Sequence, residues 1–202
     1  DKPFGACLHM DHISMKHGST AAQTAKFALM QLDEKTKFAM RTPSHTKSAD
    51  TIIDAVHRFE GTEMVIRRWW TDSAPEFKAA ARRVRSLRPL VHYTSTPHRP
   101  QSNAIIERFN RTSEDGTRCL LLRSGFPDTW WPNAMGLWIT CWTVKMLHPD
   151  GQTAWMMRFG TQPPFQIYPF GALILYKPPG KKENKDKSQP CLKAADFYRH
   201  RP

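Results

Sequence analysis

Residues 96–111, TPHRPQSNAIIERFNR, decide the fold of this chain. The two prolines in the first half fix φ and lack a backbone donor, so the stretch begins as a loop. Ser102 or Asn103 can then cap the first free N–H groups of a helix. The pattern therefore predicts a loop that turns into a helix, with the carboxylate of Glu107 one turn inside it.

Two further carboxylates lie at the ends of strand-like runs upstream. Asp72 follows the apolar and aromatic run 64–71, and Asp11 follows the run 6–10. Two strand-end aspartates and one helical glutamate can converge into an all-oxygen site for hard divalent cations, which is the arrangement that two-metal phosphoryl transfer needs. Asp11, Asp72 and Glu107 are therefore the predicted catalytic and metal-binding residues.

The same stretch closely resembles the P-x-x-P-Q-S-N-G-x-x-E-R-x-N signature of retroviral and LTR-retrotransposon integrases. Residues 70–77, WTDSAPEF, are similar to the second motif of that family, T/S-D-x-G-x-E-F, and the separation of 35 positions (107 − 72) matches the family spacing to within one residue. The phrases WWPNA at 130–134 and PFG at 169–171 point further, to the copia type of retrotransposon. The resemblance covers roughly residues 5–179.

The order of predicted elements favours an α/β fold with a mixed sheet, because several strands come first and strands and helices then alternate. The resemblance implies an RNase H-like fold, with a mixed five-stranded sheet flanked by helices, a C-terminal helical extension and a small β element. It divides the chain into a catalytic core at 1–125, a helical extension at 126–160 that completes the core or makes a dimer contact, and a C-terminal extension with a basic linker at 161–202.

The resemblance also implies an activity and its partners. The expected enzyme is a polynucleotidyl transferase, a DNA integrase that trims element DNA ends and joins them to target DNA with two Mg²⁺ or Mn²⁺ ions per site. We expect element ends and target duplex as partners and a homo-oligomer as the assembly. Such a protein is intracellular and acts in the nucleus, with cytoplasmic particles as an earlier stage.

The predicted DNA-binding residues lie in the loop and on the helix that follows it. In the family, the loop matched here contacts element DNA near its ends, and Arg108 and Arg111 are close enough to the predicted metals to grip phosphates, although a helix neighbour could satisfy either one. The predicted set is His98, Arg99, Gln101, Ser102, Asn103, Arg108 and Arg111.

The chain departs from the family pattern at three positions, because Ala104 and Ala74 replace glycines and Glu114 stands where many integrases carry a basic residue. Two other functions remain open. A degenerate or domesticated copy would bind DNA without catalysis, and Mn²⁺-dependent strand joining separates it from an active enzyme. An RNase H-type nuclease would cleave RNA in hybrids, but the proline-rich loop argues against it.

Composition agrees with a nucleic-acid partner. The 202 residues carry a net charge of +12 and a sequence pI of about 9.8, and clustered Lys and Arg gain free energy by releasing counterions from phosphates.

The four cysteines are widely scattered, so we expect free thiols. No apolar run approaches a membrane span, so no membrane partner is expected. The chain starts at Asp1, so we expect a piece of something longer.

Several local features carry further predictions. His9 and His12 flank Asp11, and a metal role is conceivable, but Mg²⁺ prefers oxygen and we interpret both histidines as core or surface fillers. Gly116 is expected to break or kink the helix that holds Glu107. That helix should also carry the ion pairs Glu107–Arg111 and Glu114–Arg118. The tryptophans at 131, 138 and 142 share one helical stripe, which predicts burial or a subunit contact more than base stacking.

The element boundaries expected from pattern alone are listed here in chain order. Strands are predicted at 6–14, 26–32, 37–41, 64–70, 90–94 and 172–176, and helices at 46–60, 74–87, from 102 or 103 onward, at 127–147 and at 153–159. Ser48 is the expected N-cap of the helix at 46–60 and Gly61 its stop. Residues 181–187 have the composition of a solvated linker.

Overall fold

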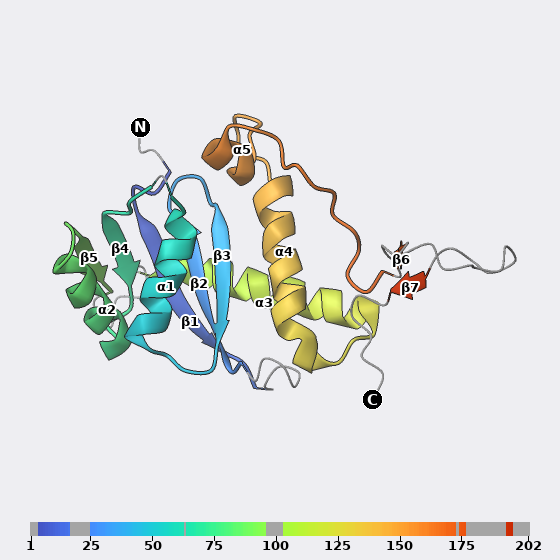
Figure 1. The fold of residues 1–202 in the computed structure, drawn as a ribbon, viewed down its shortest axis with the longest axis horizontal. Helices are drawn as coiled ribbons and strands as arrows, with labels where there is room; N and C mark the ends of the chain where they lie inside the picture. Colours follow the sequence, from blue (N-terminus) through green and yellow to red (C-terminus); the bar gives the residue numbers. More distant parts are fainter. Residues whose placement is uncertain are drawn as a thin grey trace, which may run out of the picture.

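The computed structural model describes residues 4–16, 25–62, 64–95, 103–172, 174–176 and 193–195. The main sheet has five strands in the order β3-β2-β1-β4-β5 (Figure 1). Strand β1 pairs antiparallel with β2 and parallel with β4, while β2–β3 is antiparallel and β4–β5 is parallel. The predicted mixed five-stranded sheet is therefore confirmed. Its strands are β1 (Leu8–Ser14), β2 (Phe27–Asp33), β3 (Ala39–Ser44), β4 (Arg68–Thr71) and β5 (Val91–Thr94).

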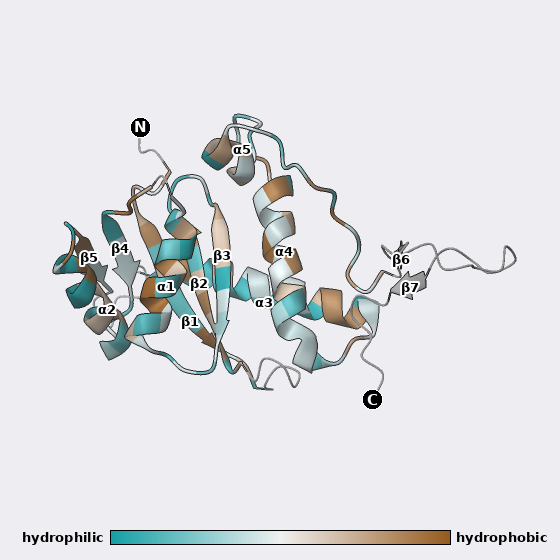
Figure 2. Cartoon of the chain, in the orientation of Figure 1, coloured by the Kyte–Doolittle hydropathy of each residue, from teal (hydrophilic) through white to brown (hydrophobic). Residues whose placement is uncertain are grey.

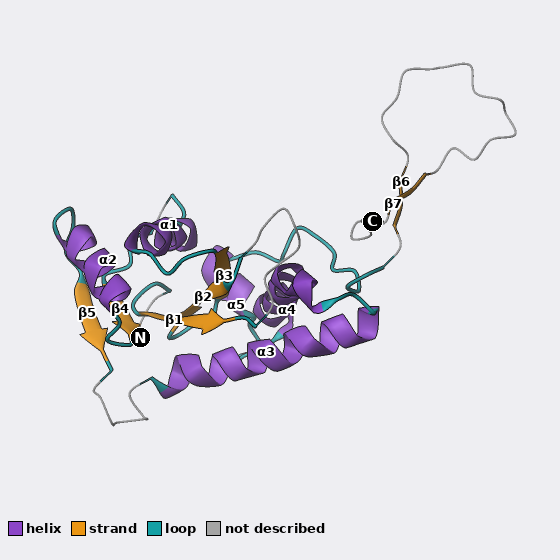
Figure 3. Cartoon of the chain, turned by 90° about the horizontal axis from the view of Figure 1, so that it is seen from below, coloured by secondary structure: helices purple, strands orange, loops and turns teal. Residues whose placement is uncertain are grey.

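Helices cover both faces of this sheet (Figure 3). Helices α1 (Ala49–Glu60) and α2 (Pro75–Arg85) lie on one face, and α3 (Ala104–Ser124) and α4 (Trp131–Lys145) lie on the other. A short 3-10 helix, η2 (Asp128–Trp130), leads into α4, and α5 (Ala154–Phe159) follows it. A separate antiparallel pair, β6 (Ile174–Tyr176) and β7 (Lys193–Ala195), forms the small β element.

The two hydrophobic cores follow from the alternation of side chains along the strands. Leu8 and Met10 of β1 pack toward α1 and α2, whereas Ile13 packs toward α3 and α4. Strand β2 alternates in the same way, with Leu29 in the first core and Met30 in the second. Figure 2 shows the resulting apolar bands on the central strands. Each fully buried side chain of this size contributes roughly 1.5–3 kcal/mol to folding.

The ends of α1 agree with the capping signals in the sequence. Ser48 caps α1 by accepting from the N–H of Thr51 at 3.2 Å, and Gly61 ends the helix at a φ of 71°. At α3 the prediction was only partly right. Asn103 occupies the cap position, but its side chain makes no capping hydrogen bond.

The expectation that Gly116 breaks its helix was wrong. Helix α3 runs without interruption from 104 to 124, so Gly116 lies in its interior. Its role is close packing: a Cβ at this position would lie 1.8 Å from Nε1 of Trp138 on α4. The glycine therefore lets the indole ring lie directly on the backbone of α3, which a sequence pattern cannot reveal.

The tryptophan stripe of α4, residues 131, 138 and 142, belongs to the second core, with the first ring buried and the other two partly buried, which agrees with the predicted burial. Trp131 is 1% exposed, while Trp138 and Trp142 stack on each other with centroids 5.5 Å apart and both contact Phe109 of α3. Within the part of the chain that is described, no helix has the length and apolar character needed to cross a membrane.

Other differences concern element ends, strand β7, which the sequence did not predict, and one ion pair. Strand β4 begins only at Arg68, four residues later than predicted, and β6 begins at Ile174. On α3, Arg118 pairs with Glu114 at 3.6 Å, but the expected pair between Glu107 and Arg111 is absent from the ion pairs of the described residues. The predicted linker at 181–187 lies outside those residues.

Candidate metal and DNA site

The sheet register brings two of the predicted acids together. In the parallel pair of β1 and β4, His9 lies opposite Trp70. Asp11 and Asp72 each follow two residues later, so the parallel pairing of two distant segments brings them side by side. Asp72 directly follows the last residue of β4, as predicted. Asp11 lies inside β1, so the prediction that it ends its strand was wrong, because β1 continues to Ser14 in its pairing with β2.

Asp72 is held in place by its own backbone surroundings. One of its carboxylate oxygens accepts from the N–H of Ala74 at 3.0 Å, just before α2 begins. The hydroxyl of Thr71 donates to the carbonyl of Asp72 at 2.6 Å and lies 2.8 Å from Nε2 of His92 on β5. Ala74 has a φ of −61°, which any residue adopts, so the alanine that replaces the family's glycine fits this turn without strain.

Helix α3 brings Glu107 to the same region from the other layer. Glu107 lies in the first turn of α3 and is exposed to solvent. One turn later, Asn110 is buried, and its Nδ2 donates to Oδ2 of Asp11 at 2.9 Å. Residues three apart share a helix face, so this hydrogen bond places the face of α3 that carries Glu107 beside β1.

An open pocket of about 310 Å³ lies along this contact between β1 and α3. Residues 12–14 of β1 form one side, and Glu107, Asn110, Arg111 and Glu114 of α3 form the other. The pocket therefore has two carboxylates and one guanidinium at its wall, next to the strand that carries Asp11.

The electrostatics of Asp11 reflect this crowding of acids. Burial is the main cause that raises the pKa of Asp11 to about 6; the negative charges of Asp72 and Glu107 contribute to the rise, while the hydrogen bond from the N–H of His12 opposes it. A half-buried carboxyl with two like charges close by is stabilised by any cation that replaces its proton. The three acids are thus electrostatically coupled in the metal-free chain.

Two basic side chains adjoin this region, and sequence reasoning did not select either as part of the site. Burial lowers the pKa of His12 to about 4, with help from the charge of Lys47, so His12 is neutral at pH 7. Its ring packs against Phe77 at 5.0 Å, which agrees with its interpretation as a filler. Lys47 is exposed, and its charge also lowers the pKa of Asp11, so it is a cation near the acids.

The predicted DNA-binding residues fall into two groups. His98, Arg99, Gln101 and Ser102 lie outside the described residues. Among the others, Arg108 and Arg111 are exposed on α3, and Arg111 also lines the pocket. Asn103 is buried at the start of α3 with only 7% of its surface exposed, which leaves little of it accessible to a ligand.

Sequence reasoning also missed Asn110 as part of the site. Its signal was present, because it lies three residues after Glu107 in the quoted motif and therefore on the same helix face. Only the packing of α3 on β1 shows that its partner is Asp11.

Comparison with solved structures decides the fold. The chain matches the catalytic core domain of BIV integrase with a TM-score of 0.57 at 14% identity, covering 76% of this chain and 93% of that one. The fold is that of a retroviral integrase catalytic core. The integrase core of HTLV-2, solved in complex with magnesium, matches at a TM-score of 0.57 and 16% identity over 77% of this chain and 96% of that one.

A third match to the integrase core fold covers more of the chain. An intasome of simian T-cell lymphotropic virus, in complex with a PP2A regulatory subunit, matches at a TM-score of 0.64 and 14% identity. It covers 93% of this chain and 62% of that one.

The chain is homologous to retrovirus-related Pol polyproteins of Arabidopsis thaliana. It is 24% identical to the polyprotein of transposon RE1 over 176 residues and 25% identical to that of transposon RE2 over 175 residues. These alignments cover 83% and 82% of this chain but only 12% of each polyprotein. No family model matches the chain.

Proposed function

We propose that this chain is the catalytic core of a copia-type retrotransposon integrase, which trims element DNA ends and joins them to target DNA in the nucleus. The observation that carries the proposal is the coupling of three acids from three elements. Asp11, inside β1, lies beside Asp72, which directly follows β4, and the charges of Asp72 and Glu107 both contribute to raising the pKa of Asp11.

The residues present fit a pair of hard divalent cations. All three proposed ligands are carboxylates, and oxygen ligands are what Mg²⁺ and Mn²⁺ prefer. Burial, more than the charges of Asp72 and Glu107, raises the pKa of Asp11, and a cation bound there would stabilise its charged form. When bound, such ions supply activation of a hydroxyl nucleophile and stabilisation of the leaving oxygen in phosphoryl transfer.

The chain's own residues then position the acids and the nucleic acid. The side-chain amide of Asn110 and the backbone N–H of His12 each donate to one oxygen of Asp11, which fixes the orientation of its carboxylate. The N–H of Ala74 does the same for Asp72. Lys47 and Arg111 place positive charge beside the acids, where a phosphodiester would lie, and the net charge of +12 favours a polyanion over the whole surface.

Homology to Pol polyproteins and the integrase core fold support a reaction on DNA ends, and the match to an intasome supports an oligomeric assembly. An RNase H-type nuclease would share the fold. The proline-rich motif that precedes Glu107 favours the integrase reaction instead.

The experiment is strand joining of a labelled duplex oligonucleotide with a recessed 3′-end into supercoiled plasmid, in Mn²⁺ and in Mg²⁺. Wild type should transfer label to the plasmid, and Asp11→Asn, Asp72→Asn and Glu107→Gln should each abolish transfer. Asp115→Asn is the matched control, because Asp115 is an exposed acid on the same helix. A wild type that binds Mn²⁺ but joins no DNA would favour the degenerate DNA-binding copy, and cleavage confined to RNA in hybrids would favour the nuclease.

A further inference from the structure

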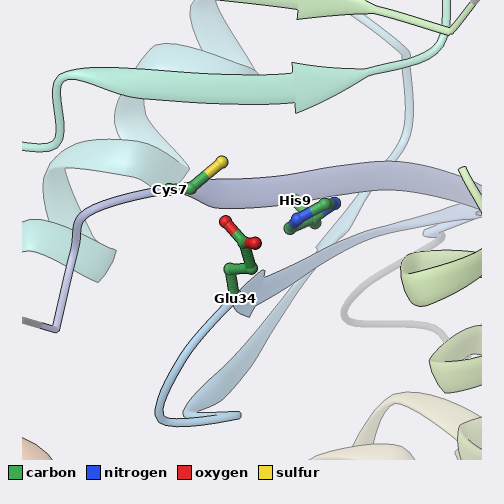
Figure 4. Close-up of side chains that lie close together, drawn as sticks. All are labelled: Cys7, His9 and Glu34. Carbon is green, nitrogen blue, oxygen red and sulfur yellow. The ribbon is translucent and has the colours of Figure 1, made fainter. Parts of the chain in front are cut away.

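Three potential metal ligands of different chemistry lie together at the other end of β1 (Figure 4). Cys7 immediately precedes β1, His9 is its second residue, and Glu34 immediately follows β2. None of them belongs to the three-acid site, although His9 lies two residues before Asp11 on the same strand.

The sheet register explains why the three side chains share one face. Because Leu8 pairs with Asp33 in the antiparallel ladder, Cys7 lies directly opposite Glu34, and the N–H of Glu34 donates to the carbonyl of Cys7 at 2.9 Å. Directly opposed residues project to the same side of a sheet, as do residues two apart on one strand. Cys7, His9 and Glu34 therefore meet there by topology.

The distances suit a small divalent ion after a modest adjustment. One nitrogen, sulfur or oxygen atom from each residue lies within 4.8 Å of the other two. A position within about 2.8 Å of all three atoms therefore exists, whereas zinc bonds are about 2.3 Å to sulfur and 2.0–2.2 Å to nitrogen and oxygen. Closing the site requires movements of about 0.5–0.8 Å, which side-chain torsions supply.

The surroundings hold the ligands in place. Cys7 and His9 are only 5% and 4% exposed. Asp33, which is fully buried, accepts from the N–H of Gly5 at 2.9 Å and from the N–H and hydroxyl of Thr36 at 2.8 Å. This one carboxylate thus ties the segment before Cys7 to the turn that contains Glu34, so that both are fixed before any ion binds.

Trp70 of β4 fixes the remaining ligand. Its ring stacks on the imidazole of His9, with centroids 6.1 Å apart and an interplanar angle of 26°. A ring held in this way loses little further freedom when it binds a metal.

We propose that Cys7, His9 and Glu34 bind one zinc ion. Thiolate and imidazole ligands select borderline-soft ions such as Zn²⁺, whereas Mg²⁺ prefers oxygen. The ion would cross-link the start of β1 to the turn after β2 and so stiffen the strand that carries Asp11. The proposal differs from the interpretation of His9 as a filler, and it does not depend on the proposed integrase activity.

Cobalt substitution tests the proposal directly, because Co²⁺ replaces Zn²⁺ and a thiolate ligand gives a charge-transfer band in the near ultraviolet. Wild type with one equivalent of Co²⁺ should show this band, and one equivalent of Zn²⁺ should remove it. Cys7→Ser should lose the band, and Glu34→Gln should weaken Co²⁺ binding at least tenfold. The matched controls Cys119→Ser, Cys141→Ser, Cys191→Ser and Asp11→Asn should retain it, also in excess Mg²⁺.

A second readout covers the case in which a variant folds poorly. Zn²⁺ should raise the urea midpoint of wild type and of Cys119→Ser, should raise that of Glu34→Gln less, and should not raise that of Cys7→Ser. The proposal is overturned if wild type gives no band, if the band survives in Cys7→Ser, if excess Mg²⁺ displaces the cobalt, or if Zn²⁺ leaves the midpoint of wild type unchanged.

Discussion

Replacing Asp11 by asparagine should stabilise the metal-free protein at neutral pH while removing its activity. Burial, with the charges of Asp72 and Glu107, raises the pKa of Asp11 from 3.8 to about 6. The folded state therefore binds this proton more tightly than the unfolded state. The resulting stability is fully present below about pH 4 and is lost as the pH rises through about 6.

The size of the effect follows from the shift and from the hydrogen bonds of Asp11. A shift of about two pKa units means that ionising Asp11 costs the folded state roughly 3 kcal/mol of stability at neutral pH. An asparagine, which stays neutral, avoids this cost. Asparagine has one acceptor oxygen where Asp11 uses two, for the donors of His12 and Asn110, and a lost hydrogen bond costs about 1 kcal/mol. Its new N–H groups can donate to Oδ1 of Asn110, which is buried with no hydrogen-bond partner. We expect a net gain of about 2 kcal/mol, or roughly 4–8 °C in Tm.

The assay is urea unfolding in EDTA at neutral pH and near pH 4. Asp11→Asn should exceed wild type by about 2 kcal/mol at neutral pH and by much less near pH 4, where both side chains are uncharged. Asp115→Asn changes the net charge equally at an exposed site and should show no such pH-dependent gain. If Asp11→Asn is less stable than wild type at neutral pH, or if its advantage is the same at both pH values, the raised pKa of Asp11 is wrong.

Four further predictions concern packing, charge, positioning and the loop. Gly116→Ala should lower stability by about 1–3 kcal/mol in urea unfolding, because its Cβ must displace the ring of Trp138, and an unchanged midpoint would contradict the close packing. Affinity for duplex DNA should fall steeply with salt, and Lys47→Ala should reduce the magnitude of the log–log slope by about 0.9; an unchanged slope would remove Lys47 from the interface. Asn110→Ala should raise the pKa of Asp11 above about 6 in a carbon-13 NMR titration, because the hydrogen bond that Asn110 donates stabilises the charged carboxylate and the variant lacks it; a lower pKa would contradict this role. Ala104→Gly should raise the strand-joining rate in Mg²⁺ and cost up to about 1 kcal/mol of stability, because glycine frees the hinge at the start of α3; an unchanged rate in an active protein would refute the hinge.

The sequence by itself determined the features whose causes are local. Apolar runs bounded by polar turns marked β1 and β2, and Ser48 and Gly61 marked the ends of α1, because these signals depend on neighbours a few residues away. The motif around Glu107 and its separation from Asp72 also predicted the class of fold that the structural matches show.

The tertiary structure decided which residues from distant segments meet. Gly116 looks like a helix breaker until Trp138 is seen lying on it, and Asn110 looks like a helix surface residue until α3 packs on Asp11. Cys7 and Glu34 are 27 positions apart (34 − 7), and they become neighbours only because β1 and β2 pair in one particular register. A shift of that register by one residue would place them on opposite faces, since side chains alternate along a strand. Such contacts depend on how the whole chain packs, so a local sequence pattern does not predict them.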